Sequence, residues 1–315
     1  MPFTRWFISA PWFAVSSILL AQIPQLEIHP PRIAAESFRS PDLRVNVDLV
    51  LLTVTVTDRF GSVVNNLAEP SFTILEDNTP RPIVSFNSED AACSVGVVID
   101  ISGSMGGKTN LAAEAMRTFF DAANPDDEAF LLTVSTRPNT LSGFTNDFGN
   151  LQSQLSMSRP GGATALVDTI QLALRRLREA RNPRRALLVI SDGMDNHSRY
   201  SEAALLRLAQ EADVQIYTIG MATSAVNKKG IEMTEEPGGL AFLSHLSERS
   251  GGLNFTLGTY ENPVSIASKI GRAIRDRYLI GYHPSASDAG KWRAIRVKVD
   301  VPQLHVSTRS GYYAR

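Results

Sequence analysis

Side chains with oxygen ligands gather in three segments that lie far apart along the 315-residue chain. The first segment, "VVIDISGSMGGKT", contains Asp100, Ser102 and Ser104, spaced as Asp-x-Ser-x-Ser. The second, "RPGGATALVD", contains Thr164, and the third, "LLVISDGMDN", contains Asp192. Mg²⁺ binds hard oxygen ligands in an octahedron and keeps several waters. The three segments together predict a site for Mg²⁺, with Mn²⁺ or Ca²⁺ as alternatives.

The residue types also suggest how such a site would work. We expect the hydroxyls of Ser102, Ser104 and Thr164 to contact the ion, with Asp100 and Asp192 acting through water or hydroxyl hydrogen bonds. Neutral hydroxyls leave the charge of the ion poorly balanced, so the remaining coordination position favours an anionic donor. A Glu or Asp carboxylate on a partner protein is the expected donor.

The segments that must position these residues follow an α/β pattern. From Cys93 onward, apolar strands alternate with amphipathic helices, which is typical of a parallel sheet covered on both faces. Asp100 and Asp192 stand at the carboxyl ends of two such strands, the edge where open α/β sheets bind ligands. The expected strands span 94–100, 128–135, 186–192, 214–220 and 253–257, and helical spacing predicts helices around 112–119, 166–177, 205–212 and 267–274.

Short β-strands flank this region on both sides. Residues 44–57 alternate with a change of parity near Leu51 and Leu52, which predicts a strand with a bulge. Further strands are expected at 71–77, 81–87, 278–284, 294–301 and 305–314. We therefore expect an N-terminal β unit over 44–90, an α/β domain over 91–277, and C-terminal strands in 278–315 that pair with the N-terminal unit.

Charge and cysteine content narrow the classes of partner and compartment. The 31 basic and 32 acidic residues leave a net charge of -1, so nucleic acid is not an expected partner. Residues 1–21 resemble an export signal, with an uncleaved membrane anchor as the alternative, and no later segment is apolar enough to span a membrane. An extracytoplasmic location, periplasmic or secreted, is expected. Cys93 is the single cysteine, so the chain has no internal disulfide.

Two catalytic alternatives use the same residues. "SGSMGGKT" matches a phosphate-binding loop except that Ser102 replaces the first glycine, and Asp192 would then serve the nucleotide's Mg²⁺. Against it, Asp100 would face anionic phosphates, and an exported protein meets little ATP. A serine nucleophile lacks a general base, because no histidine is near and Lys108 is four residues from Ser104. A metal-assisted hydrolase also lacks a positioned base.

Purely structural roles are the other alternative. Asp100 and Ser102 would then cap the following helix, Thr164 would cap a helix beginning at Ala165, and Asp192 would be a turn residue. The protein would then be a structural envelope module with an empty metal site. We interpret the nearby Asp168 and Asp195 as carboxylates supporting the site or a helix terminus, and His197 as a solvated loop residue.

The motif resembles a known adhesion site. Asp100-x-Ser102-x-Ser104, with Thr164 in "GGATALVD" and Asp192 in "SDGMDN", is similar to the metal-ion-dependent adhesion site of a von Willebrand factor type A domain, over residues 92 to 277. The flanks "VTVTDRFGSVVNNLAEPSFTILEDNTPRPIVSF", "RYLIGYHP" and "STRSGYYA" resemble the von Willebrand-related family abundant in Acidobacteria.

This resemblance implies a Rossmann-like, doubly wound, mainly parallel sheet with Mg²⁺ at its top, beside a small antiparallel β domain. It also implies non-catalytic protein binding, so the expected function is an exported, metal-dependent adhesion module. The polar segment 221–239 is expected to be a loop that leaves the metal edge and shapes partner choice.

Overall fold

The computed structural model describes residues 49–88, 91–222, 224–226, 232–234, 237–258, 262–285 and 290–314. All of them lie within one compact unit, Val47–Arg315. The expected leader, residues 1–21, lies outside the described residues. None of the described helices has both the length and the hydropathy needed to cross a bilayer.

A six-stranded sheet forms the centre of the α/β domain, in the order β12-β9-β8-β5-β6-β7. Five strands are parallel, and only the edge strand β7 runs antiparallel to its neighbour β6. The expected mainly parallel α/β fold is therefore confirmed. The strands are β5 Cys93–Asp100, β6 Glu128–Val134, β7 Asn139–Thr145, β8 Arg184–Ser191, β9 Gln215–Met221 and β12 Asn254–Leu257.

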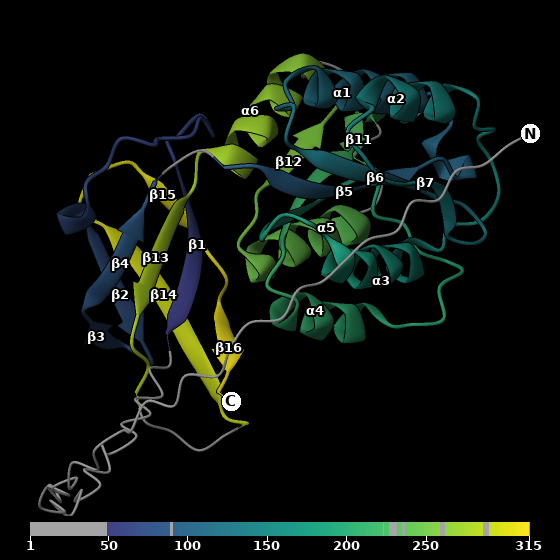
Figure 1. Cartoon of the computed structure of the whole chain (residues 1–315). Coiled ribbons are helices and arrows are strands. Elements are labelled where there is room, and N and C mark those ends of the chain that lie inside the picture. The colour runs from purple at the N-terminus through teal and green to yellow at the C-terminus, as the bar shows by residue number, and fades with distance from the viewer. Residues whose placement is uncertain are drawn as a thin grey trace, which may run out of the picture. The chain divides into compact units, whose positions relative to one another are not determined.

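Helices cover both faces of this sheet. Figure 1 shows α1, α2 and α6 on one face and α3, α4 and α5 on the other. They are α1 Thr109–Asp121, α2 Phe148–Ser156, α3 Leu166–Arg176, α4 Glu202–Glu211, α5 Pro237–Ser250 and α6 Pro263–Arg275, and the short 3₁₀ turns are η1 Glu69–Ser71, η2 Gly103–Met105 and η3 Leu177–Glu179. Every residue of β5 is buried because both of its faces are covered.

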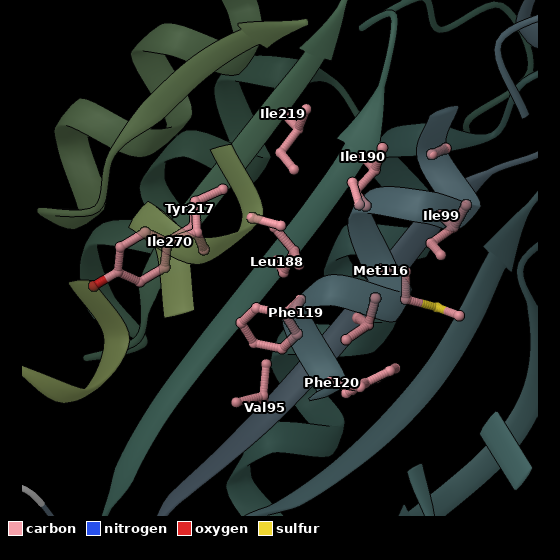
Figure 2. Packing of buried hydrophobic residues seen from close by; sticks show 14 of the residues in the cluster. Val95, Ile99, Met116, Phe119, Phe120, Leu188, Ile190, Tyr217, Ile219 and Ile270 are labelled. Atoms are coloured by element: carbon pink, nitrogen blue, oxygen red, sulfur yellow. The ribbon is translucent and has the colours of Figure 1, made fainter. Parts of the chain in front are cut away.

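Two hydrophobic cores result from this layering. Val95, Val97 and Ile99 of β5 point to the core beneath α1, α2 and α6, whereas Val98 points to the core above α3, α4 and α5. Figure 2 shows the first core, where Phe119 and Met116 of α1 lie against the sheet. The loops that carry the predicted ligands therefore begin at the carboxyl ends of strands that are packed on both faces.

Two four-stranded antiparallel sheets form the β unit. Their orders are β15-β1-β13-β4 and β16-β14-β2-β3, so strands from before and after the α/β domain share each sheet. One core lies between them, where the Phe72 and Tyr278 ring centroids are 4.8 Å apart. The strands are β1 Val50–Thr57, β2 Phe72–Glu76, β3 Thr79–Arg81, β4 Ile83–Asn87, β13 Tyr278–Tyr282, β14 Trp292–Val299, β15 His305–Ser307 and β16 Gly311–Tyr313.

The bulge expected near Leu51 and Leu52 is wrong. The pairing of β1 with β13 runs without a shift from Val50 to Val54. Leu51 is an exposed apolar residue, so the parity of the buried positions does not change. An irregularity occurs instead where β13 meets β4, between Gly281 and Tyr282.

The segment 221–239 is not simply a loop. Its described parts include a hairpin of β10 Ser224–Val226 with β11 Glu232–Thr234, and α5 begins at Pro237. Residues 223, 227–231 and 235–236 lie outside the described residues.

Candidate metal centre

Three loops meet at the carboxyl ends of β5 and β8. The loop after β5 joins the loop before α3, because Gly103 N donates to Gly162 O at 3.1 Å. The loop after β8 joins the same segment, because Asn196 N and His197 N both donate to Thr164 O at 3.0 Å. The backbone therefore brings together the three segments that carry the predicted ligands.

Asp100 is the buried centre of this arrangement. Its side chain is fully shielded from solvent, and each carboxylate oxygen accepts a hydrogen bond. Oδ1 accepts from Ser102 N at 2.9 Å, and Oδ2 accepts from the Ser191 hydroxyl at 2.6 Å. Burial raises the pKa of Asp100, and the negative charge of Asp192 adds to this, while the hydrogen bonds from Ser102 and Ser191 oppose it. Asp100 is thus placed to orient the loop from beneath.

Ser102 and Ser104 present adjacent hydroxyls. Their Oγ atoms are 3.1 Å apart, with Ser102 buried and Ser104 exposed. Mg²⁺ binds oxygens at about 2.1 Å, so neighbouring corners of its octahedron are separated by about 3 Å. The two hydroxyls therefore fit neighbouring positions around such an ion.

The interpretation of Asp100 and Ser102 as helix caps is wrong. Helix α1 begins at Thr109, its N-cap position is Lys108, and no side chain caps it. Ser102 holds the N-cap position of η2 without a side-chain capping bond. The hydroxyls are not engaged in stabilising a helix terminus.

Thr164 is held by its backbone, which leaves its hydroxyl available. Thr164 N donates to Asn196 Oδ1 at 2.9 Å, and the residue is 2% exposed. Helix α3 begins at Leu166 with Ala165 at its N-cap, so the expected cap role of Thr164 is wrong. Among the described residues the Thr164 hydroxyl has no hydrogen bond, including none to Ser102 or Ser104.

Asp192 has two local partners. Its Oδ1 accepts from Met194 N at 3.2 Å, so the turn interpretation holds in part. Its Oδ2 lies 3.5 Å from Lys108 Nζ, and both side chains are largely buried. Lys108 Nζ also donates to Met221 O at 3.3 Å. A protein cation thus lies at the same edge of the sheet as the predicted divalent ion.

Residues that the motif alone did not identify support the site. The Ser191 hydroxyl, besides donating to Asp100, accepts from Gly193 N at 3.0 Å. The Asn196 amide fixes Thr164, as described above. Both residues lie in "VISDGMDN", so adjacency to Asp192 was the only signal in the sequence.

The two accessory carboxylates occupy a helix terminus, as expected. Asp195 Oδ2 accepts from Val167 N in the first turn of α3 at 2.7 Å. Asp168, also in the first turn, accepts from Arg199 N and Tyr200 N at 3.0 and 3.2 Å. His197 is exposed on this loop.

Gly193 allows the loop after β8 to approach α5. Its φ is +81°, and a Cβ there would lie 2.1 Å from Gly239 O. Only glycine fits both the conformation and the contact.

The donor set fits a hard cation bound by hydroxyls. No group of three or more His, Cys, Asp or Glu residues suited to a metal occurs in the described part of the chain. What the loops assemble is two adjacent serine hydroxyls, a free threonine hydroxyl and carboxylates behind them.

The sequence model of one domain family matches part of the α/β domain. Residues 95–194 match the sequence model of the von Willebrand factor type A domain. A curated protein of Borreliella burgdorferi, described only as uncharacterized, is 26% identical over 144 residues, which is 42% of each chain. The aligned region therefore spans less than half the length of that relative.

Among solved structures, an aerotolerance-related membrane protein from Bacteroides fragilis is 18% identical, with a TM-score of 0.48 over 58% of this chain and 98% of that one. A von Willebrand factor type A protein from Catenulispora acidiphila is 10% identical, with a TM-score of 0.47 over 85% of this chain and 75% of that one. The range 95–194 matched by the sequence model covers most of β5, all of β8 and the residues Asp100, Ser102, Ser104, Thr164 and Asp192. The match of the sequence model assigns residues 95–194 to a von Willebrand factor type A domain.

Proposed function

We propose that the carboxyl edge of the sheet binds Mg²⁺ and, through it, a Glu or Asp carboxylate of a partner protein. The observation that carries this proposal is the 3.1 Å separation of the Ser102 and Ser104 hydroxyls. Neither hydroxyl makes a capping hydrogen bond to η2 or α1. Domains of this family are generally non-catalytic interaction modules, and the proposal keeps this protein within that class.

Each residue has a distinct part in the proposed site. Ser102, Ser104 and Thr164 would hold the ion, and the ion would supply positive charge for a ligand carboxylate. Asp100 fixes the Ser102 backbone and the Ser191 hydroxyl, so the loop is oriented before any ion arrives. Asp192 would contribute negative charge nearby.

Hydrogen bonds already made by the backbone of the serine loop weaken the nucleotide alternative. A phosphate-binding loop cradles phosphates with free N–H groups. Here five N–H groups between Ser102 and Lys108 already donate to protein oxygens, including Gly103 N to Gly162 O. Lys108 is also engaged by Asp192 and Met221 O. These contacts favour the metal over a nucleotide.

The nucleophile alternative lacks support in the contacts of the serines. The Ser104 hydroxyl interacts with Ser102 Oγ, which is not a general base. The proposal is therefore a binding module with an extracytoplasmic location, the latter resting on the export signal expected in residues 1–21.

The test is cation-dependent capture by the full chain. The immobilised protein is incubated with envelope extract in Mg²⁺ or in excess chelator, and Ser104→Ala serves as the matched variant because Ser104 is exposed. We expect a partner retained only with Mg²⁺ and only by the wild type. Equal retention with chelator, or by Ser104→Ala, would contradict the proposal. Release of phosphate from ATP, abolished by Lys108→Met, would support the nucleotide alternative instead.

A further inference from the structure

A second cavity lies away from the metal centre, at the amino ends of the sheet strands. It has a volume of about 220 Å³ and is lined by Arg184 and Arg185 at the start of β8 and by Gln215 at the start of β9. From the β unit, Leu51 and Thr53 of β1 line it. The cavity is therefore formed jointly by the α/β domain and the β unit.

The charges around this cavity are unbalanced. Among the described residues, five charged side chains line it, and four of them are arginines: Arg184, Arg185, Arg277 and Arg309. The single acid is Asp213, which pairs with Arg309 at 3.1 Å and has a side chain that is 73% exposed. A mostly solvated carboxylate compensates little of the positive charge that faces the cavity.

Some of the guanidinium donors at the cavity lack acceptors among the described residues. Arg277 is 4% exposed, and its Nη1 donates to Gln215 Oε1 at 2.7 Å, while its Nη2 has only a 3.9 Å contact with Cys93 Sγ. The Nε atoms of Arg277, Arg185 and Arg309 are buried with no hydrogen-bond partner among the described residues, although Arg309 donates through its Nη atoms to Asp213 and Leu51 O. An arginine carries five N–H donors and stays charged, so such donors are costly to leave unmet in the interior.

We propose that this cavity binds a small oxyanion of the phosphate or sulfate type. Arginine forks suit tetrahedral oxyanions because they donate several parallel hydrogen bonds to them. The volume accommodates such an anion with a few waters, and it is smaller than the pockets of drug-sized ligands. Because Arg309 belongs to the β unit and Arg185 and Arg277 to the α/β side, a bound anion ties the two together.

Inorganic phosphate is the probe for this site, titrated into the full chain by calorimetry and thermal melting. Excess chelator is present throughout, which removes any contribution of the metal centre. Sodium chloride at equal ionic strength controls for screening. We expect saturable phosphate binding that raises the melting temperature, and no such effect of chloride.

Arg185→Gln is the principal variant, because no hydrogen bond of Arg185 in the described part of the chain is lost with it. Arg207→Gln is the matched control, since Arg207 is exposed on α4 and does not line the cavity. We expect Arg185→Gln to weaken phosphate binding at least tenfold and Arg207→Gln to leave it unchanged.

Arg277→Lys keeps the buried charge but removes the planar guanidinium, and it should also weaken phosphate binding. If Arg185→Gln binds phosphate as the wild type does, or if chloride produces the same stabilisation, the proposal is overturned.

Discussion

Lys108 Nζ lies 3.5 Å from Asp192 Oδ2, at the same edge of the sheet as the hydroxyls of Ser102 and Ser104. Lys108 stands at the N-cap position of α1, directly after the serine loop, and also reaches Met221 O at the end of β9. Its ammonium compensates the charge of Asp192. At the proposed metal site it would therefore oppose the binding of a divalent ion.

Replacing Lys108 with Met should therefore strengthen Mg²⁺ binding and weaken the metal-free fold. Removing a positive charge near the ion is expected to lower the Kd by on the order of tenfold. A tenfold change corresponds to about 1.4 kcal/mol of electrostatic repulsion between the ammonium and the ion. Calorimetric titration measures the Kd, and melting in chelator measures the metal-free stability. Lys298→Met, an exposed change on β14, is the control. An unchanged or weaker Kd in Lys108→Met would show that Lys108 does not compete with the ion.

Ser104→Ala should remove the response to Mg²⁺ without altering the metal-free protein. Ser104 is exposed, and among the described residues its hydroxyl contacts only that of Ser102, so its loss costs the fold little. Binding confined to the native state adds about 2.7 kcal/mol at a hundredfold excess over Kd. We expect the wild type to gain this stability in Mg²⁺ and the variant to gain almost none, as measured by urea unfolding. A variant that responds like the wild type would remove Ser104 from the ligand set.

Asp100→Ala should destabilise the protein even without metal. The change leaves the Ser102 N–H and the Ser191 hydroxyl without their buried acceptor. Each such loss costs about 1–3 kcal/mol, so the free energy of unfolding should fall by at least about 2 kcal/mol. Asp100→Asn keeps one carbonyl acceptor and should lose less stability while still lacking the charge. Equal stability of Asp100→Ala and the wild type in chelator would contradict the role given to Asp100.

The β unit should lose stability in acid through Glu76. Burial by itself would raise the pKa of this carboxyl, but hydrogen bonds from Ser285 and Tyr312 and the charge of Arg81 outweigh it, so its pKa is lowered. The Tyr312 hydroxyl donates at 2.8 Å, and Arg81 Nη2 lies at 3.0 Å. A lowered folded pKa gives stability that is present above the ordinary Glu pKa of about 4.3.

That stability is lost as the pH falls through the folded pKa of Glu76. Glu76→Gln should therefore melt at a lower temperature than the wild type at neutral pH. Its free energy of unfolding should be lower by about 2 kcal/mol there, and this difference should shrink in acid. Melting curves across the acidic range measure this, and Glu69→Gln, an exposed change, is the control. A Glu76→Gln variant with the same acid profile as the wild type would exclude this role.

Much of the α/β fold could be predicted because parallel strands that are buried on both faces are nearly continuous runs of apolar residues. Continuous apolar runs such as Val95–Ile99 require helices on both faces, and the helical stripes supply them. The edge strand β7, "NTLSGFT", was missed because it is half-exposed and polar. Helix α5 was missed because it opens on Pro237, Gly238 and Gly239, which are poor helix formers.

The site was predictable only as a set of ligand types at strand ends. The sequence places Asp100 and Asp192 after strands, but the pairing of Lys108 with Asp192 joins residues 84 positions apart and depends on how loop and helix pack. The role of Ser191 likewise depends on the register of β5 beside β8. Such contacts are set by tertiary packing, which local spacing does not encode.

The most direct test of the central claim is the position of a bound ion in crystals of the protein soaked with Mn²⁺, located by anomalous scattering. The account predicts one strong peak at bonding distance from both Ser102 Oγ and Ser104 Oγ, with Thr164 Oγ1 turned toward it. Crystals that bind Mn²⁺ elsewhere, with no peak at the serine hydroxyls, would contradict it.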